Sequence, residues 1–149
     1  MAGNKHIGLG TAAIGRPLYI NVRQSTDEKP FSLPKFKEDG LQVLEDAYSN
    51  GVRFFDTSPG YGLAEQLLID WLNKKDDPDI IVSTKWGYTY VANFDPNAKE
   101  HEVKEHSIDK LSNQWEFSKM LLPHLKVCQC HSATLDTVFF ENIDFVPFI

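Results

Sequence analysis

The sequence predicts an α/β fold in which parallel strands are joined by crossover helices. Short runs of β-branched or aromatic residues alternate with longer segments of helical period, which is the pattern of repeated βα units. Ionisable residues stand at the ends of several of these runs. With 149 residues and a hydrophobic content of 42%, the chain is also long enough to bury one core. We therefore expect one α/β unit with about four parallel strands.

The first part of the chain is predicted to run from a brief strand through a polar loop into a helix. The strand is expected at Lys5 to Gly8, and the charges and two prolines of residues 24–34 indicate the loop. The helix is expected from Lys35 to Asn50, because apolar residues recur there at helical spacing and Asn50 with Gly51 supplies a left-handed stop.

The rest of the chain is predicted to contain three further strands and two further helices. Residues 87–105 are expected to be irregular, and an excursion of that length between a strand and a helix is often functional. Ser107 is the predicted N-cap of the helix that follows. The expected strands are Val52 to Asp56, Ile80 to Lys85 and Lys126 to His131, and the expected helices are Leu63 to Asn73 and Ser107 to about Leu122.

The composition limits the class of partner. The net charge of −6 argues against nucleic acid and against an anionic membrane surface, because both require clustered Lys and Arg. No run has the length of a secretory signal core or of a membrane span, so a cytoplasmic location is expected. A small molecule is the expected ligand.

Three ionisable residues end successive predicted strands. They are Asp56, Lys85 and His131. Tyr61 follows the first of them by five residues, in a turn of proline and glycine. The three strand-end residues also have ordinary structural explanations. The aspartate could cap a helix, the lysine could be solvated, and the histidine could be a hydrogen-bonded core residue. Because side chains at the carboxyl ends of parallel strands converge, we expect all four to share one site.

These four side chains predict proton transfer to a carbonyl oxygen. A phenol is a poor proton donor near neutrality, but an ammonium beside it stabilises the phenolate, and a carboxylate holds that ammonium charged and in place. A neutral imidazole opposite could donate a hydrogen bond to a carbonyl oxygen. The side chains supply no electron source, so a hydride would have to come from a bound cofactor.

The sequence disfavours three alternative sites. Gly8, Gly10 and Ala13 match the G-x-G-x-x-G/A dinucleotide fingerprint, but Gly15 and Pro17 would interrupt the helix that this motif requires. Another pair, His101 and His106, has a spacing that does not place both imidazoles on one helical face, which disfavours a metal site. The cysteines at positions 128 and 130 are expected to be reduced packing residues rather than nucleophiles.

Four segments of the sequence resemble the aldo-keto reductases over roughly residues 5–135. They are "IGLGTAAIG", "GVRFFDTSPGYG", "IIVSTKWG" and "VCQCHSAT". The resemblance implies that Tyr61 is the general acid, that Asp56 and Lys85 tune it, and that His131 positions the carbonyl group. It also implies an NADPH cofactor whose nicotinamide end lies against Gly10, Thr11 and Asp56, with Trp86 lining the substrate pocket. The substrate would be a small aldehyde or ketone.

The implied fold is the N-terminal half of a (β/α)8 TIM barrel. A complete barrel needs about 250 residues, so we expect residues 1–149 to form a single partial domain, with an atypical, apolar tail at 138–149. Two functions follow from this expectation. The chain is either an NADPH-dependent carbonyl reductase or a catalytically inactive remnant that lacks the C-terminal cofactor-binding half. Open sheet edges would also favour self-association.

Overall fold

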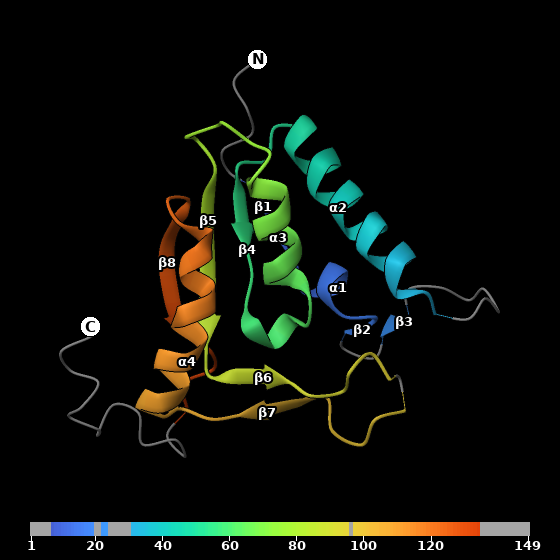
Figure 1. Cartoon of the computed structure of the whole chain (residues 1–149), viewed down its shortest axis with the longest axis vertical. Helices are drawn as coiled ribbons and strands as arrows, with labels where there is room; N and C mark the ends of the chain where they lie inside the picture. Colours follow the sequence, from blue (N-terminus) through green and yellow to red (C-terminus); the bar gives the residue numbers. More distant parts are fainter. Residues whose placement is uncertain (1–6, 20–21, 24–30, 96, 135–149) are drawn as a thin grey trace.

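The centre of the protein is a parallel sheet of four strands in the order β1-β4-β5-β8 (Figure 1). The computed structural model describes residues 7–19, 22–23, 31–95 and 97–134. All three neighbouring pairs in this sheet are parallel, so the predicted parallel arrangement is confirmed. The strands are β1 (Gly8–Gly10), β4 (Phe54–Asp56), β5 (Ile81–Trp86) and β8 (Leu125–Cys130). The predicted tail at 138–149 lies outside the described residues.

The three main helices lie close to their predicted positions. They are α2 (Leu33–Ser49), α3 (Ala64–Leu72) and α4 (Ile108–Ser118), the last continued by the 3-10 turn η2 (Lys119–Leu121). The predicted N-cap at Ser107 is confirmed, because its Oγ accepts a hydrogen bond from the Lys110 amide at 3.1 Å. The chain leaves the helical path before Pro123, as the sequence indicates.

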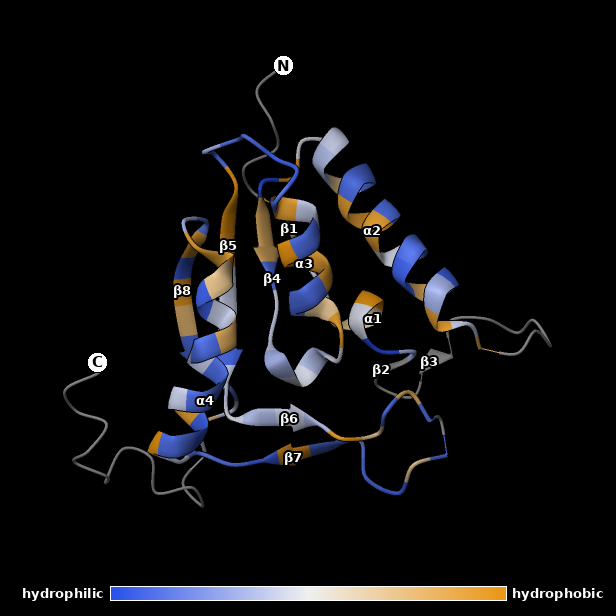
Figure 2. Cartoon of the chain, in the orientation of Figure 1, coloured by the Kyte–Doolittle hydropathy of each residue, from blue (hydrophilic) through white to orange (hydrophobic). Residues whose placement is uncertain are grey.

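The hydrophobic core lies between the sheet and the helices. Phe55 and Val82 are fully buried neighbours on β4 and β5, and they face the same side of the sheet because they are paired in register. The ring of Phe55 packs against Trp71 of α3, with centroids 5.1 Å apart. Figure 2 shows hydrophobic colouring along β4 and β5, behind α3 and α4. The buried cluster also includes Leu44, Leu67, Leu68, Ile69, Leu72, Ile80, Leu121 and Leu125.

The opposite face of the sheet is uncovered among the described residues. Three large apolar side chains, Phe54, Ile81 and Val127, are 39–45% exposed there. Because side chains alternate along a strand, this face also carries Asp56, Ser83 and Lys85. The polar groups occupy the carboxyl end of this face and the apolar groups its amino end.

Residues 87–105 are more regular than the sequence predicts. They include β6 (Tyr88–Tyr90) and β7 (Glu102–Lys104), which pair antiparallel. Figure 1 shows this hairpin crossing the end of the sheet toward which the strands point. The expectation of an irregular segment is therefore wrong at these two strands. The residues at 88–90 have the composition of a strand and could have indicated β6. Its partner strand lies a dozen residues later, beyond a polar loop, so the pairing was not evident from the sequence.

Two short elements follow β1. Helix α1 (Ala12–Gly15) begins directly after the glycines but ends within four residues, before Pro17, and this agrees with the case against a dinucleotide-binding helix. The strands β2 (Leu18–Tyr19) and β3 (Val22–Arg23) then form a small antiparallel pair. Within the described part of the chain, no helix combines the length and apolar character needed to cross a bilayer.

Candidate active site

Asp56 and Lys85 form an ion pair at the carboxyl end of the sheet. The distance between Lys85 Nζ and Asp56 Oδ2 is 2.5 Å, and the other carboxylate oxygen, Oδ1, accepts a hydrogen bond from Ser83 Oγ. Lys85 also donates to the Thr57 carbonyl at 3.1 Å. With a carboxylate and a carbonyl as acceptors, the ammonium is held in one position.

Backbone pairing beyond the strand ends keeps Asp56 in place. Gly10 pairs with Asp56 in register, and both the amide and the hydroxyl of Thr11 donate to the Asp56 carbonyl at 2.9 Å. On the other side, the Thr57 amide donates to the Ser83 carbonyl at 2.9 Å. The carboxylate therefore projects from a backbone that is bonded on both sides.

Tyr61 is held on a tight turn beside the ion pair. It ends the 3-10 helix η1 (Pro59–Tyr61) and is 9% exposed. Its ring centroid lies 5.0 Å from Lys85 Nζ and 5.9 Å from the guanidinium carbon of Arg16. Two cationic side chains therefore lie near the ring of Tyr61.

A glycine contact fixes the turn that carries Tyr61. Gly62 has a positive φ of 63°, and a Cβ added there would lie 2.3 Å from the Gly15 carbonyl oxygen. Conversely, a Cβ on Gly15 would meet the Tyr61 carbonyl oxygen at 1.8 Å. Only glycine permits this close approach of two backbones, which explains the glycine directly after the tyrosine.

His131 faces Tyr61 from the end of β8. The two ring centroids are 5.7 Å apart with an interplanar angle of 87°, and the ring of Tyr88 packs on the imidazole at 4.6 Å. The His131 amide donates to the Trp86 carbonyl at 2.9 Å, which extends the strand pairing by one residue. Burial, and then the positive charge of Lys85, lower the pKa of His131, which favours a neutral imidazole.

The four predicted site residues are thus brought together. The other three predicted residues, Gly10, Thr11 and Trp86, differ in where they lie relative to this group. Gly10 lies beside Asp56, and no described residue other than its chain neighbours comes within 4 Å of a Cβ built on it, so space adjoins the strand end there. Thr11 is fully buried with its hydroxyl bonded to the backbone, so it supports Asp56. Trp86 lies on the opposite face from Lys85 and packs beneath α4. This placement follows because neighbouring strand residues alternate faces, and the role of Trp86 in a substrate pocket stays a prediction.

Several residues of the site were missed by sequence reasoning. Ser58 and Ser83 bond directly to His131 and Asp56, yet single serines in a strand or turn carry no distinctive pattern. Tyr88 belongs to the hairpin that the sequence did not predict. The ion pair of Arg16 and Glu102, at 2.6 Å, links α1 to that hairpin across 86 residues of sequence. Only the tertiary structure brings these groups together.

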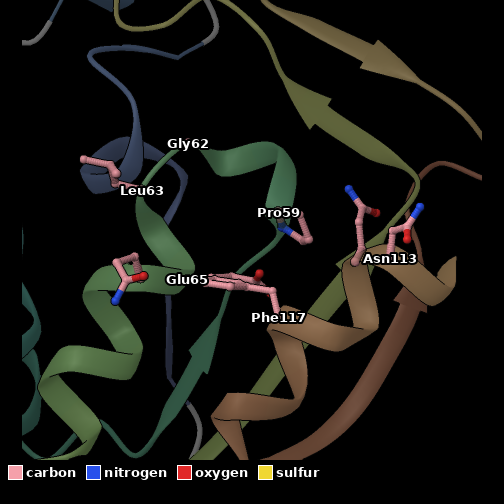
Figure 3. Close-up of a pocket in the computed structure, with 8 residues that line it drawn as sticks. Pro59, Gly62, Leu63, Glu65, Asn113 and Phe117 are labelled. Carbon is pink, nitrogen blue, oxygen red and sulfur yellow. The ribbon is translucent and has the colours of Figure 1, made fainter. Parts of the chain in front are cut away.

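A hollow of about 390 Å³ lies behind the turn of Tyr61, between the start of α3 and α4. Figure 3 shows Asn113 and Phe117 of α4 on one side of it and Pro59 on the other. None of the four site residues lines it. The four grouped residues therefore lie at the strand ends and not at this hollow. Its lining residues are Pro59, Gly62, Leu63, Glu65, Gln66, Asn113, Gln114 and Phe117.

Two further groups of residues were considered in the sequence as sites, the histidines and the cysteines. Among the described residues, no three His, Cys, Asp or Glu side chains are grouped so that they could hold a metal ion. Burial raises the pKa of Cys130 to about 11, so its sulfur is a thiol and not a thiolate nucleophile at neutral pH.

Glu65 is a buried carboxyl group beneath the site. It is 2% exposed, and its Oε1 accepts hydrogen bonds from Thr84 and Ser118, while Oε2 has no hydrogen-bond partner among the described residues. Burial raises the pKa of Glu65, and the two hydroxyl donors oppose part of that rise. The folded protein therefore favours the protonated form more than the unfolded chain does.

We expect the free energy of unfolding of Glu65→Gln, minus that of the parent protein, to increase as pH rises. A folded pKa above the unfolded value means that the contribution of Glu65 is fully favourable below the unfolded pKa and is lost as pH rises through the folded pKa. Urea unfolding between about pH 4 and 8 measures this difference, and a difference that does not change with pH would contradict it. Glu45→Gln is the control of opposite sign, because hydrogen bonds from Lys75 and Trp71 lower the pKa of Glu45.

Together, the fold and the site define a class of protein. A parallel sheet with its ionisable groups at the carboxyl ends of the strands is the arrangement of (β/α)8 enzymes. Comparison of folds agrees: two solved structures of a candidate aldo-keto reductase from Pseudomonas aeruginosa match 99% of the chain, with TM-scores of 0.63 and 0.64 at 21% and 22% identity. The chain spans 52% and 51% of those proteins, so the fold is about half of such a barrel.

The chain belongs to the aldo/keto reductase family, whose sequence profile matches residues 6–146. It is 32% identical to L-galactose dehydrogenase of Arabidopsis thaliana over 117 residues, which are 74% of this chain and 34% of that protein. Over 86 residues it is 33% identical to D-threo-aldose 1-dehydrogenase of a Pseudomonas species, covering 55% of this chain and 26% of the relative. These relatives are dehydrogenases, and the chain spans about a third or less of their length.

Proposed function

We propose that the protein takes part in the NADPH-dependent reduction of small aldehydes or ketones to alcohols. The observation that carries this proposal is the grouping of Tyr61, Lys85, Asp56 and His131 at one strand-end rim. Family membership supports the same reaction class. The cytoplasmic location expected from the sequence is part of this proposal.

In this proposal Tyr61 donates the proton to the carbonyl oxygen. The Lys85 ammonium, held by Asp56, lies 5.0 Å from the centroid of the Tyr61 ring and would stabilise the phenolate left after transfer. The neutral imidazole of His131 would donate a hydrogen bond to the same oxygen and orient it. The hairpin β6–β7, linked to α1 by the Arg16–Glu102 pair, would limit access of water to this side.

The residues present fit a nicotinamide cofactor at one end. Gly10 leaves open space beside Asp56, and these two residues would hold the nicotinamide end, while Thr11 keeps their backbones in register. When bound, the cofactor supplies the hydride that no side chain can supply.

Cofactor binding is the first test. We expect the emission of NADPH to change on titration with the purified protein, because a nicotinamide that leaves water for a protein site changes its fluorescence. NADH serves as the comparison, because a difference between the two would establish the cofactor preference. If neither cofactor shows a change at millimolar concentration, the reductase proposal fails for this chain by itself.

That failure would favour the second candidate, an inactive half-barrel. The observation on its side is that, among the described residues, the sheet leaves the apolar side chains of Phe54, Ile81 and Val127 partly exposed and has β1 and β8 as unpaired edge strands. The same features lead us to propose self-association through these edges, because unpaired edges and exposed apolar surface favour contact between copies. Sedimentation of the purified chain separates the cases, and a monomer at all concentrations would contradict self-association.

A further inference from the structure

The Ser58 side chain lies between the turn that carries Tyr61 and the ring of His131. It is fully buried, and its Oγ accepts a hydrogen bond from the Gly60 amide at 3.1 Å. The same oxygen lies 3.3 Å from Nδ1 of His131, 73 residues later in the chain. One hydroxyl therefore connects the proton-donor turn to the imidazole.

The hydrogen-bonding capacity of serine decides the direction of this contact. A hydroxyl has one hydrogen to donate and two lone pairs to accept. If His131 Nδ1 carried a proton and donated it, both contacts of Ser58 would be accepted ones, and its own hydrogen would have no acceptor among the described residues. A buried donor without an acceptor is unfavourable. If the hydroxyl instead donates to an unprotonated Nδ1, its hydrogen has an acceptor and its oxygen still accepts from the Gly60 amide.

An unprotonated Nδ1 places the proton of a neutral imidazole on Nε2. Nε2 has no hydrogen-bond partner among the described residues. His131 is half buried, so part of its ring remains accessible. Tyr88 packs on the ring at 4.6 Å and the Tyr61 ring meets it nearly at right angles, so the imidazole has little freedom to turn. The burial that lowers the pKa of His131 is consistent with a neutral ring.

We propose that Ser58 is a positioning residue that holds His131 in the neutral tautomer with its proton on Nε2, directed to donate to a carbonyl oxygen. The role of the donated hydrogen bond rests on the proposed reductase function. The tautomer itself does not, because it follows from contacts within the chain. Ser58 acts through His131 and is not itself a catalytic residue.

Nitrogen NMR of protein labelled with 15N-histidine tests the assignment without cofactor or substrate. His131→Gln identifies the His131 signals among those of the five histidines. In the parent protein we expect Nδ1 to give the signal of an unprotonated, hydrogen-bonded nitrogen and Nε2 that of a protonated one. In Ser58→Ala the Nδ1 signal should move toward that of a nitrogen without a donor, or toward a mixture of tautomers.

Two further variants make the test specific. Ser58→Thr keeps the hydroxyl and should restore the parent spectrum. Ser118→Ala removes an equally buried hydroxyl that bonds Glu65 instead, and it should leave the His131 signals unchanged. Once turnover is measurable, Ser58→Ala should lower kcat about 10- to 100-fold with little change in KM, as for other partners that orient a functional imidazole.

A proton on Nδ1 in the parent protein would overturn the proposal, and so would identical Nδ1 signals in the parent and Ser58→Ala proteins. The parent spectrum decides the tautomer even if Ser58→Ala does not fold. Because the spectra require no reaction, an inactive protein with the expected tautomer would refute the reductase function and leave the assignment of Ser58 intact.

Discussion

Replacing Tyr61 with phenylalanine is expected to lower the rate of carbonyl reduction about 100- to 10,000-fold, the usual contribution of a positioned proton donor. The substitution removes one hydroxyl and keeps the ring that fills a buried position beside Lys85 and His131. Cofactor affinity should therefore change little. Steady-state oxidation of NADPH in the presence of a small aldehyde measures the loss, and the titration of NADPH emission measures affinity.

The matched control for this prediction is Tyr48→Phe. It removes the same group from a tyrosine of α2 whose hydroxyl donates to Asp77 at 2.8 Å, away from the strand-end site. Any general cost of losing a tyrosine hydroxyl should appear in both variants, whereas the loss of turnover should appear only in the first. If Tyr61→Phe turned over as fast as the parent protein, Tyr61 could not be the proton donor.

Replacing Phe55 with alanine is expected to lower the free energy of unfolding by about 3–5 kcal/mol, the range for truncating a fully buried aromatic residue. Phe55 is 0% exposed and packs against Trp71 of α3. The cavity would open directly before Asp56, at the centre of the sheet. Because single domains are stable by about 5–15 kcal/mol, this one change could remove most of the stability. Urea unfolding followed by circular dichroism measures it.

The adjacent Phe54 provides an internal comparison. It lies on the uncovered face of the same strand and is 39% exposed, so Phe54→Ala should cost much less. An equal cost for the two variants would mean that the Phe54 face is also covered in solution, which would support self-association. A cost below about 1 kcal/mol for Phe55→Ala would contradict the core described above, since surface changes fall in that range.

Local sequence patterns were sufficient for most of the regular elements. Helical period with a Ser107 cap and an Asn50-Gly51 stop is a local signal, and α2, α3 and α4 lie within a few residues of prediction. The strands β4, β5 and β8 follow from apolar runs that end in a polar residue. Their pairing is nearly automatic, because short crossovers place consecutive parallel strands side by side.

The grouping of the site residues could also be inferred from the sequence, because it needs only two facts. Asp56, Lys85 and His131 end strands that run in the same direction, and Tyr61 is tied to Asp56 by a short turn. Parallel strands bring such ends to one rim whatever their exact register. Trp86, one residue after Lys85, lies on the helix-covered face, and its predicted place in the substrate pocket stays a prediction.

Contacts between segments far apart in the chain were decided by the tertiary structure alone. The bond between Ser58 and His131, the Arg16–Glu102 pair and the packing of Tyr88 on His131 join positions 43 to 86 residues apart. Such contacts depend on where whole elements come to rest, and no periodicity or spacing encodes them. The proposed proton donor, Tyr61, could therefore be named from the linear chain. The proposed tautomer of the imidazole that faces it depends instead on which hydroxyl the folded backbone places beside Nδ1.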